Sequence, residues 1–252
     1  MEFLLAIDIG NTNITAGIFA AGGQNPIKKI NIPTANFTSY ESSFARLLGS
    51  WARSGDIDVI ISSVVPQALL RLTKILNKIA ECRKLILGEN IDVPIKNLYK
   101  RKSEVGQDRL VNAYAAGAIY GTPAIVVDFG TAVTFDVISK KGAYLGGLIL
   151  PGIEMGLISL YEKTAALPKV NLAPAGHIIG KTTVESIRGG MLYGYAAMVD
   201  GLVSKYKNIL GSRLKTIATG GNAGLMKRYS KSILMIDSDL TLKGLNLIFK
   251  KN

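Results

Sequence analysis

Two short stretches of aspartate, glycine and threonine occupy corresponding places in the two halves of the sequence. They are Asp8-Ile9-Gly10-Asn11-Thr12 and Asp128-Phe129-Gly130-Thr131-Ala132, each placed where one hydrophobic strand should end and another begin. A glycine at such a corner lets backbone amides approach phosphate oxygens, a threonine hydroxyl adds a donor, and a strand-end aspartate can hold a metal ion or its water. Either stretch alone is more typical of an ordinary turn. As a pair they favour a site that clamps one polyphosphate.

A third stretch, Ala218-Thr219-Gly220-Gly221-Asn222-Ala223, follows a hydrophobic strand and opens a predicted helix. Its backbone can approach a ligand above the end of the strand, in a manner that suits a nucleoside. Two glycines before a helix are often only a loop, so this stretch gains its weight from the two corners.

In the first half of the chain, the corner Asp8–Thr12 is predicted to join the first two strands of an antiparallel meander. Alternating and continuous apolar runs, helical spacing and turn residues indicate the following elements. They are strands Phe3–Ile9, Ile14–Phe19 and Ile27–Ile32, a helix over Ser42–Arg53, a strand over Val59–Ser62, a helix from Pro66 to Ile79 and a strand over Lys84–Leu87. Trp51 is expected to belong to the core.

A helix over Asp108–Tyr120 follows, and then the same order of elements begins again. The predicted elements are strands Ala124–Asp128, Ala132–Ile138 and Tyr144–Leu150, helical segments within Pro151–Lys163 and Val184–Leu210, a strand over Lys215–Ala218, a helix from Asn222, a strand over Ile233–Ile236 and a helix near Asp239–Phe249. Two β-β-β-α-β-α-β-like halves predict an α/β protein with duplicated domains, residues 1–118 and 119–252, whose mixed sheets are flanked by helices around an interdomain cleft.

Composition limits the classes of protein and the cellular compartments to which this chain can belong. The chain has 252 residues, of which 48% are hydrophobic, enough for a large core. Its apolar stretches are interrupted before the ~18 residues that a membrane span requires, and its N-terminal residues do not resemble a signal peptide. One cysteine, Cys82, and one histidine, His177, cannot build a zinc site from soft ligands, and a reducing cytoplasm is the expected compartment.

The formal net charge of +12 is compatible with nucleic acid, a membrane surface or an anionic substrate. No long basic run is present, and aromatic residues are not interleaved with the basic ones. A solvated basic surface is therefore favoured over a nucleic-acid footprint, and anionic substrates stay open.

At the level of whole motifs, the sequence resembles the type III pantothenate kinases, within the superfamily of acetate kinase, sugar kinases, Hsp70 and actin. The resemblance implies duplicated ribonuclease H-like, actin-like ATPase domains. Six segments carry it in family order: Asp8–Asn13 and Asp128–Ala132 as phosphate motifs, Gly106-Gln107-Asp108-Arg109, Gly146-Gly147-Leu148-Ile149-Leu150-Pro151-Gly152, Thr164-Ala165-Ala166-Leu167-Pro168, and Thr219-Gly220-Gly221 as an adenosine motif.

The resemblance implies that ATP phosphorylates pantothenate to 4′-phosphopantothenate, the first step toward coenzyme A. Asp108 would be the base and Arg109 would orient substrate or stabilise transferred charge, although a helix-terminal aspartate and an ordinary ion pair are the alternatives. The ATP and phosphate contacts would be Asp8, Gly10, Asn11, Thr12, Asn13, Gly130, Thr131, Ala132, Gly220 and Gly221. The substrate contacts would be Tyr99, Gly106, Gln107, Asp108, Arg109 and Thr183.

The same resemblance implies metal ions and a partner subunit. Asp8 would hold Mg²⁺ through water, and Asp128 would bind a monovalent cation, K⁺ or NH₄⁺. Thr183 would reach pantothenate across the interface of a homodimer with a shared active site, although Thr182 or Thr183 can equally be a helix cap.

The sequence departs from the family at one position. The family commonly has a proline between the tyrosine and the glycine of the substrate segment, where Lys102 stands here. This change can loosen the rim of the pocket or add a cation near anionic ligands. The alternative functions are a regulator similar to Bvg accessory factors, or another small-molecule kinase or polyphosphate phosphatase of the same superfamily.

Overall fold

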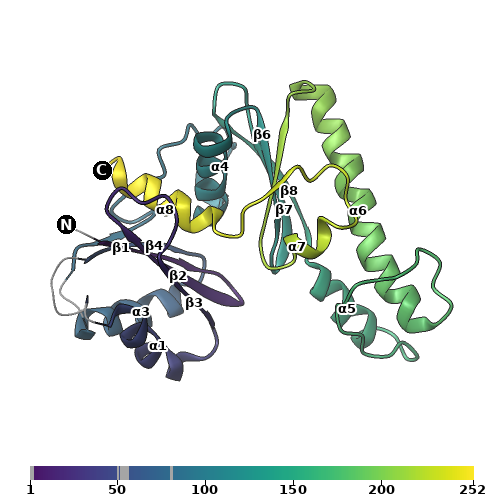
Figure 1. Ribbon diagram of the computed structural model, residues 1–252, viewed down its shortest axis with the longest axis horizontal. Helices are drawn as coiled ribbons and strands as arrows, with labels where there is room; N and C mark the ends of the chain where they lie inside the picture. The colour runs from purple at the N-terminus through teal and green to yellow at the C-terminus, as the bar shows by residue number, and fades with distance from the viewer. Residues whose placement is uncertain (1–2, 50, 52–56, 80–81) are drawn as a thin grey trace. The chain divides into compact units, whose positions relative to one another are not determined.

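The computed structural model describes residues 3–49, 51, 57–79 and 82–252 (Figure 1). The chain forms two compact units. One consists of Met1–Ala115 together with Asp239–Asn252, and the other of Ala116–Ser238. Each unit contains a five-stranded mixed sheet with helices against it.

The first unit contains the predicted meander and two further strands parallel to its first strand. Its elements are β1 (Phe3–Ile9), β2 (Asn13–Ala20), β3 (Lys28–Pro33), η1 (Phe37–Ser39), α1 (Tyr40–Leu48), β4 (Ile57–Ser63), α3 (Pro66–Ile79), β5 (Lys84–Ile86), η2 (Lys102–Glu104), most of α4 (Gln107–Tyr120), and α8 (Leu240–Lys250). The sheet order is β3-β2-β1-β4-β5, with β1, β2 and β3 antiparallel and β4 and β5 parallel to β1.

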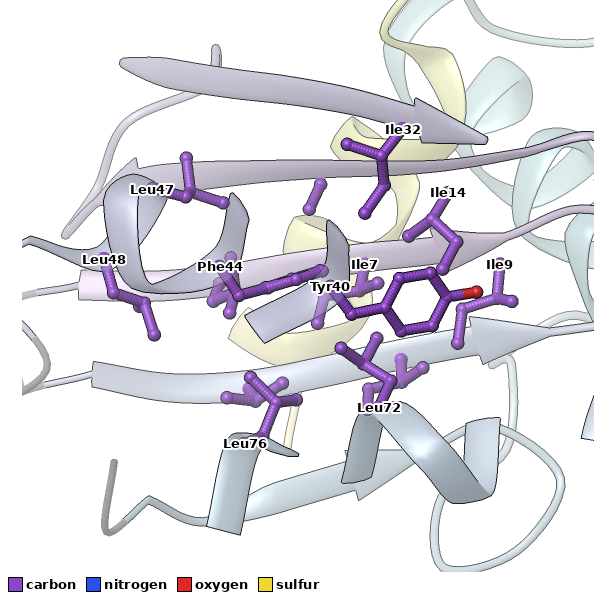
Figure 2. Packing of buried hydrophobic residues seen from close by; sticks show 14 of the residues in the cluster. Ile7, Ile9, Ile14, Ile32, Tyr40, Phe44, Leu47, Leu48, Leu72 and Leu76 are labelled. Carbon is purple, nitrogen blue, oxygen red and sulfur yellow. The ribbon is translucent and has the colours of Figure 1, made fainter. Parts of the chain in front are cut away.

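Apolar residues on both faces of this sheet are covered. On one face, side chains of β1 and β2 such as Ile7 and Ile14 pack against Phe44 of α1 and Leu72 of α3 (Figure 2). Helix α8 covers the other face of β1, β2 and β4 (Figure 1). Burial on both faces explains why β1 is an almost continuous apolar run and not an alternating one.

The second unit repeats the pattern. Its elements are β6 (Ala124–Phe129), β7 (Ala132–Ile138), β8 (Tyr144–Pro151), α5 (Ile153–Glu162), α6 (Thr183–Leu210), β9 (Lys215–Thr219), α7 (Ala223–Met226) and β10 (Met235–Ile236). The sheet order is β10-β9-β6-β7-β8, with β6, β7 and β8 antiparallel and β9 and β10 parallel to β6. Its core lies between this sheet and α6, where Val127 and Phe135 join Leu192 and Val199.

The two sheets therefore share one topology, and the predicted duplication is confirmed. Asp8 is the penultimate residue of β1, and Asp128 is the penultimate residue of β6. Each aspartate faces a threonine on the antiparallel neighbour, Thr15 or Thr134, and a hydroxyl residue on the parallel neighbour, Ser62 or Thr219.

The division into units differs from the expected one near the end of the chain, where residues from Asp239 onward return to the first unit. Residues 119–252 were expected to form the second domain, whereas α8 belongs to the first unit. Gly244 explains this packing: a Cβ there would lie 2.6 Å from Val111 Cγ1 and 2.9 Å from the Val111 carbonyl oxygen of α4. Thr241 also donates a hydrogen bond to Asn112 Oδ1 at 2.7 Å.

Smaller differences concern the ends of elements. The helix predicted over Ser42–Arg53 is α1, which starts two residues earlier and is capped by Gly49 at a positive φ of 53°. Residues 50, 52 and 53 of that prediction lie outside the described residues. Trp51 packs on the core as expected. β10 is shorter than predicted, since Ile233 is buried without joining the sheet.

A membrane-crossing helix was not expected from the sequence. Among the residues that the structure describes, no helix combines the length and apolar character needed to span a bilayer.

Candidate active site

The first corner is the tight turn that joins β1 to β2. The Gly10 N–H donates to the Asn13 carbonyl oxygen at 3.0 Å and closes the turn. Thr34, just after β3, holds the same turn from the side. Its Oγ1 donates to the Gly10 carbonyl at 2.7 Å, and its N–H donates to the Thr12 carbonyl at 2.9 Å. The side chains of Asn11, Thr12 and Asn13 are exposed, and so the turn presents donors outward from a fixed backbone.

A buried tyrosine anchors Thr34 to the core. The Tyr40 hydroxyl donates to the Thr34 carbonyl oxygen at 2.6 Å, and its ring is fully buried. Figure 2 shows this ring among Ile7, Ile9 and Ile14, with its oxygen toward Ile9 and Ile14. Sequence reasoning missed both residues, because the register of β2 and β3 brings Thr34 to the turn and no local pattern marks it.

The end of β4 connects this corner to the start of α4. The Val64 N–H donates to the Ile9 carbonyl at 3.0 Å. A Cβ at Gly106 would lie 3.7 Å from Val64 Cγ1 and would overlap Asp108 Oδ1. The structure thus brings Asp8, Gly10, Gly106 and Asp108 into one continuous region of the first unit.

Asp108 lies in the first turn of α4, where the Arg109 N–H donates to its Oδ1 at 2.8 Å. Burial raises the pKa of Asp108 above its ordinary value, and it outweighs the opposing effects of that hydrogen bond and of the Arg109 charge. A partly buried carboxylate with a raised pKa is a candidate general base. Because any side chain at position 106 would overlap Asp108 Oδ1, only glycine there allows the Asp108 carboxylate to keep its position.

The other predicted substrate residues of this unit precede Asp108 in the chain. The side chain of Gln107 packs on the backbone of Gly88, where a Cβ would lie 2.9 Å from Gln107 Nε2. Tyr99 is half-buried, and its N–H donates to Asn97 Oδ1 at 2.9 Å. Lys102 is exposed at the start of η2. Its neighbours Arg101 and Glu104 form an exposed ion pair at 3.1 Å, which secures this one-turn helix only weakly.

The second corner joins β6 to β7 in the other unit. Asp128 pairs with Thr219 of β9, and the glycine that follows Thr219 crosses directly over Asp128. Gly220 has a positive φ of 86°, and a Cβ there would overlap Asp128 Oδ1 and lie 2.7 Å from the Phe129 carbonyl carbon. The structure therefore places the third motif against the second corner. Neighbouring Gly221 is exposed, and α7 begins two residues later.

Gly152, which follows β8 and precedes α5, supports the same corner. A Cβ at Gly152 would overlap the Thr131 carbonyl oxygen and lie 2.9 Å from that of Gly130. Gly152 belongs to the segment Gly146–Gly152, for which no role at this corner was expected from the sequence. Its role is steric: the exposed Gly130–Thr131 turn lies directly on this glycine.

Thr183 lies apart from the second corner, at the start of α6. Thr182 is the residue that caps this helix, because its Oγ1 accepts from the Glu185 N–H at 3.2 Å, while Glu185 Oε2 accepts from the Lys181 N–H at 2.7 Å. Thr183 is exposed and is not used as the cap. The first turns of α6 pack on α5 through Ile187 and Leu157 (Figure 1).

Hard oxygen ligands are available at both corners, where Asp8 and Asp128 are the strand-end carboxylates. Among the described residues, no three histidine, cysteine or acidic side chains gather in one place. One or two carboxylates fit a Mg²⁺ ion that keeps most of its waters and takes further ligands from substrate phosphates.

Two sheets of one topology, each ending in an Asp-x-Gly corner, define the duplicated fold of actin-like ATPases and sugar kinases. Two solved structures support the fold. One is described as a Baf family transcriptional activator from Campylobacter jejuni, with a TM-score of 0.60, 21% identity and 98% of each chain covered. The other is an inorganic polyphosphate/ATP-glucomannokinase from Arthrobacter sp. strain KM, with a TM-score of 0.52, 14% identity and 100% of each chain covered.

The chain belongs to the type III pantothenate kinase family. The sequence model of that family matches residues 4–205. A type III pantothenate kinase of Halalkalibacterium halodurans is 39% identical over 254 residues, covering 99% of this chain and 99% of the relative. One of Syntrophus aciditrophicus is 40% identical over 255 residues, again covering 99% of each.

Proposed function

We propose that this enzyme transfers the γ-phosphoryl group of ATP to the primary hydroxyl of pantothenate and so makes 4′-phosphopantothenate for coenzyme A synthesis. Membership of the kinase family supports the reaction. The observation that carries the site is the half-buried carboxylate of Asp108, which lies in the same unit as the Gly10 turn and is linked to it through Val64.

Asp108 acts as the base in this proposal. A bond forms between the pantothenate hydroxyl oxygen and the γ-phosphorus, the bond from that phosphorus to the bridging oxygen breaks, ADP leaves, and the hydroxyl proton passes to Asp108. Arg109 orients the substrate or stabilises the transferred charge. The reaction needs mainly alignment and charge neutralisation, and a fixed turn with outward donors suits both.

The nucleotide contacts are the residues of the two corners and the third motif. Asn11, Thr12 and Asn13 of the first corner and Thr131 of the second present exposed polar groups for phosphate oxygens. Gly220 and Gly221 allow the backbone to approach the adenosine. Tyr99, Gly106 and Gln107, next to Asp108 in the chain or on its flank, bind pantothenate.

Two cations complete the proposal. Asp8 holds Mg²⁺ through water, and Asp128, with the nearby Thr219 hydroxyl, binds K⁺ or NH₄⁺. Both ions supply positive charge that offsets the negative charge of the phosphates.

We expect Na⁺ in place of K⁺ to lower the rate of the wild-type enzyme, and Asp128→Ala to remove that difference. Equal rates of the wild type in both salts would refute the assignment of Asp128.

A homodimer is the proposed assembly, with Thr183 of one subunit contacting the pantothenate bound by its partner. Helix α5 supports an interface, because Ile153 and Leu157 are buried while Met155, Ile158 and Tyr161 on its other side are each about half exposed. Exposed apolar side chains that gather on one side of a helix are typical of an interaction surface, and on α5 they alternate with the exposed Glu154 and Glu162. The proposed compartment is the cytoplasm.

The deciding experiment is a coupled assay of the purified protein with ATP, Mg²⁺, K⁺ and pantothenate. Mass spectrometry should identify 4′-phosphopantothenate, and ADP should form at the same rate. No turnover over a range of Mg²⁺ and monovalent cations would overturn the proposal.

A regulatory role is not favoured. The solved structure described as a transcriptional activator shares only the fold at 21% identity. Asp108 and both phosphate corners have no chemical use in a protein that only binds DNA. A salt-sensitive shift of DNA mobility is the result that would support such a role.

A further inference from the structure

Ser62 is a buried polar residue to which the reaction described above assigns no part. It lies at the penultimate position of β4 and is 0% exposed. Its hydroxyl has no hydrogen-bond partner among the described residues. Buried hydroxyl groups nearly always have a partner, because leaving one unpaired disfavours the folded state.

The position of Ser62 is next to the first corner. It pairs with Asp8 in the parallel register of β1 and β4, so both side chains project from the same face of the sheet. Two residues later, Val64 donates its N–H to Ile9 and lies beside the Gly106 position that Asp108 contacts. The unpaired hydroxyl therefore lies in the layer that connects the Asp8 carboxylate to the start of α4.

The second unit repeats this arrangement. Thr219 pairs with Asp128 in the same parallel register and is also buried. In both units, then, the strand-end carboxylate has a hydroxyl side chain as its neighbour on the parallel strand. A hydroxyl residue thus recurs beside the strand-end carboxylate, and in the first unit, where this hydroxyl is unpaired, it has an evident use, which is to bond the carboxylate in the occupied state.

We propose that Ser62 is a positioning residue for Asp8. With Mg²⁺ and ATP bound, its hydroxyl donates a hydrogen bond to the Asp8 carboxylate and fixes the oxygen that holds the metal-bound water. Rotation about the Cα–Cβ bond of Ser62 turns its hydroxyl among three staggered positions. This inference rests on the proposed role of Asp8 and adds a residue outside the six motifs.

The test is Ser62→Ala, measured first by calorimetry with a non-hydrolysable ATP analogue at several Mg²⁺ concentrations. A hydrogen bond to a charged group is strong enough that about tenfold more Mg²⁺ should be needed for half-saturation. Binding of the Mg²⁺-free analogue should stay unchanged. The melting temperature of the ligand-free variant should equal or exceed that of the wild type, since the substitution removes an unpaired hydroxyl.

Rescue and control variants separate positioning from a structural effect. Ser62→Thr keeps the hydroxyl, as Thr219 does in the second unit, and should restore the Mg²⁺ dependence. Thr216→Val is the matched control, because Thr216 Oγ1 is also buried without a partner in β9 and lies three residues before Thr219. It should leave the Mg²⁺ dependence as in the wild type.

A wild-type Mg²⁺ dependence in Ser62→Ala would overturn the inference, as would an equal shift in Thr216→Val. In kinetics, the Mg²⁺ requirement should rise while the KM for pantothenate stays constant. Because the calorimetry needs no pantothenate, a protein without pantothenate kinase activity that still shows the shift would refute the proposed function and leave the role of Ser62 standing.

Discussion

At the scale of single residues, the first unit uses glycine to bring polar atoms together that a side chain would separate. Gly106 leaves room for the Asp108 carboxylate. The sequence identifies Asp108 and Gly106 through a short motif, since both belong to one helix start. It cannot identify Thr34 or Tyr40, whose contacts with the Gly10 turn depend on strand register and on core packing.

Asp108→Asn should lower kcat by at least ~100-fold, because asparagine cannot accept the hydroxyl proton. Burial raises the pKa of Asp108, so the acidic limb of the pH profile of kcat/KM should lie above the ordinary range of an aspartate. When folding raises the pKa of a carboxyl group, the folded protein loses stability as the pH rises from the pKa of that group in the unfolded chain to its pKa in the folded protein. At neutral pH, Asp108→Asn should therefore leave the free energy of unfolding unchanged or higher.

Glu104→Gln is the matched control for this prediction. Glu104 is an exposed carboxylate four residues from Asp108, and it pairs only with Arg101 in the described contacts. Its substitution should leave both kcat and the pH profile unchanged. A fall in kcat below threefold in Asp108→Asn would rule out the base role.

At the scale of elements, the second corner is positioned by the ends of strands. Most of these strands were predictable from the pattern of apolar residues. Continuous apolar runs indicated β1, β4 and β6 because these strands are buried on both faces. The predicted length of β10 was too great, since an apolar run does not distinguish residues that pair in a sheet from residues that are only buried, such as Ile233. The crossing of Gly220 over Asp128 was not predictable, because it requires knowledge that β9 pairs with β6.

Gly220→Ala should lower the free energy of unfolding by about 1–3 kcal/mol, because a side chain at φ 86° is strained and its Cβ would overlap Asp128. Urea denaturation measures the change, and nucleotide affinity should fall with it. Gly224→Ala in α7 is the control: nothing lies within 4 Å of a Cβ there, and alanine in a helix should hold or raise stability. Equal stability of both variants would contradict this account of the corner.

At the scale of the whole molecule, composition and periodicity predict a duplicated α/β protein but not which sheet each helix covers. Helix α8 was expected with its sequence neighbours, yet Gly244 fits it to α4 in the first unit. Surface composition is equally hard to interpret from sequence alone. That Met155, Ile158 and Tyr161 of α5 are exposed becomes evident only once Ile153 and Leu157 are seen to be buried.

Ile158→Asp should convert the proposed dimer into a monomer, because a carboxylate at the centre of an apolar interface is desolvated without a partner. Sedimentation velocity gives the oligomeric state directly. Ile209→Asp is the control, since Ile209 is 75% exposed near the end of α6, away from α5 in the sequence. A monomeric wild type, or a dimeric Ile158→Asp variant, would contradict the interface.

The return of α8 to the first sheet sets an order of events during synthesis on the ribosome. Residues 116–238 form one uninterrupted segment, so every residue of the second unit is synthesised before Leu240. The first unit starts to emerge earlier but receives the helix that covers β1, β2 and β4 only afterwards. The half of the protein that carries Asp8 and Asp108 is therefore translated first and completed last.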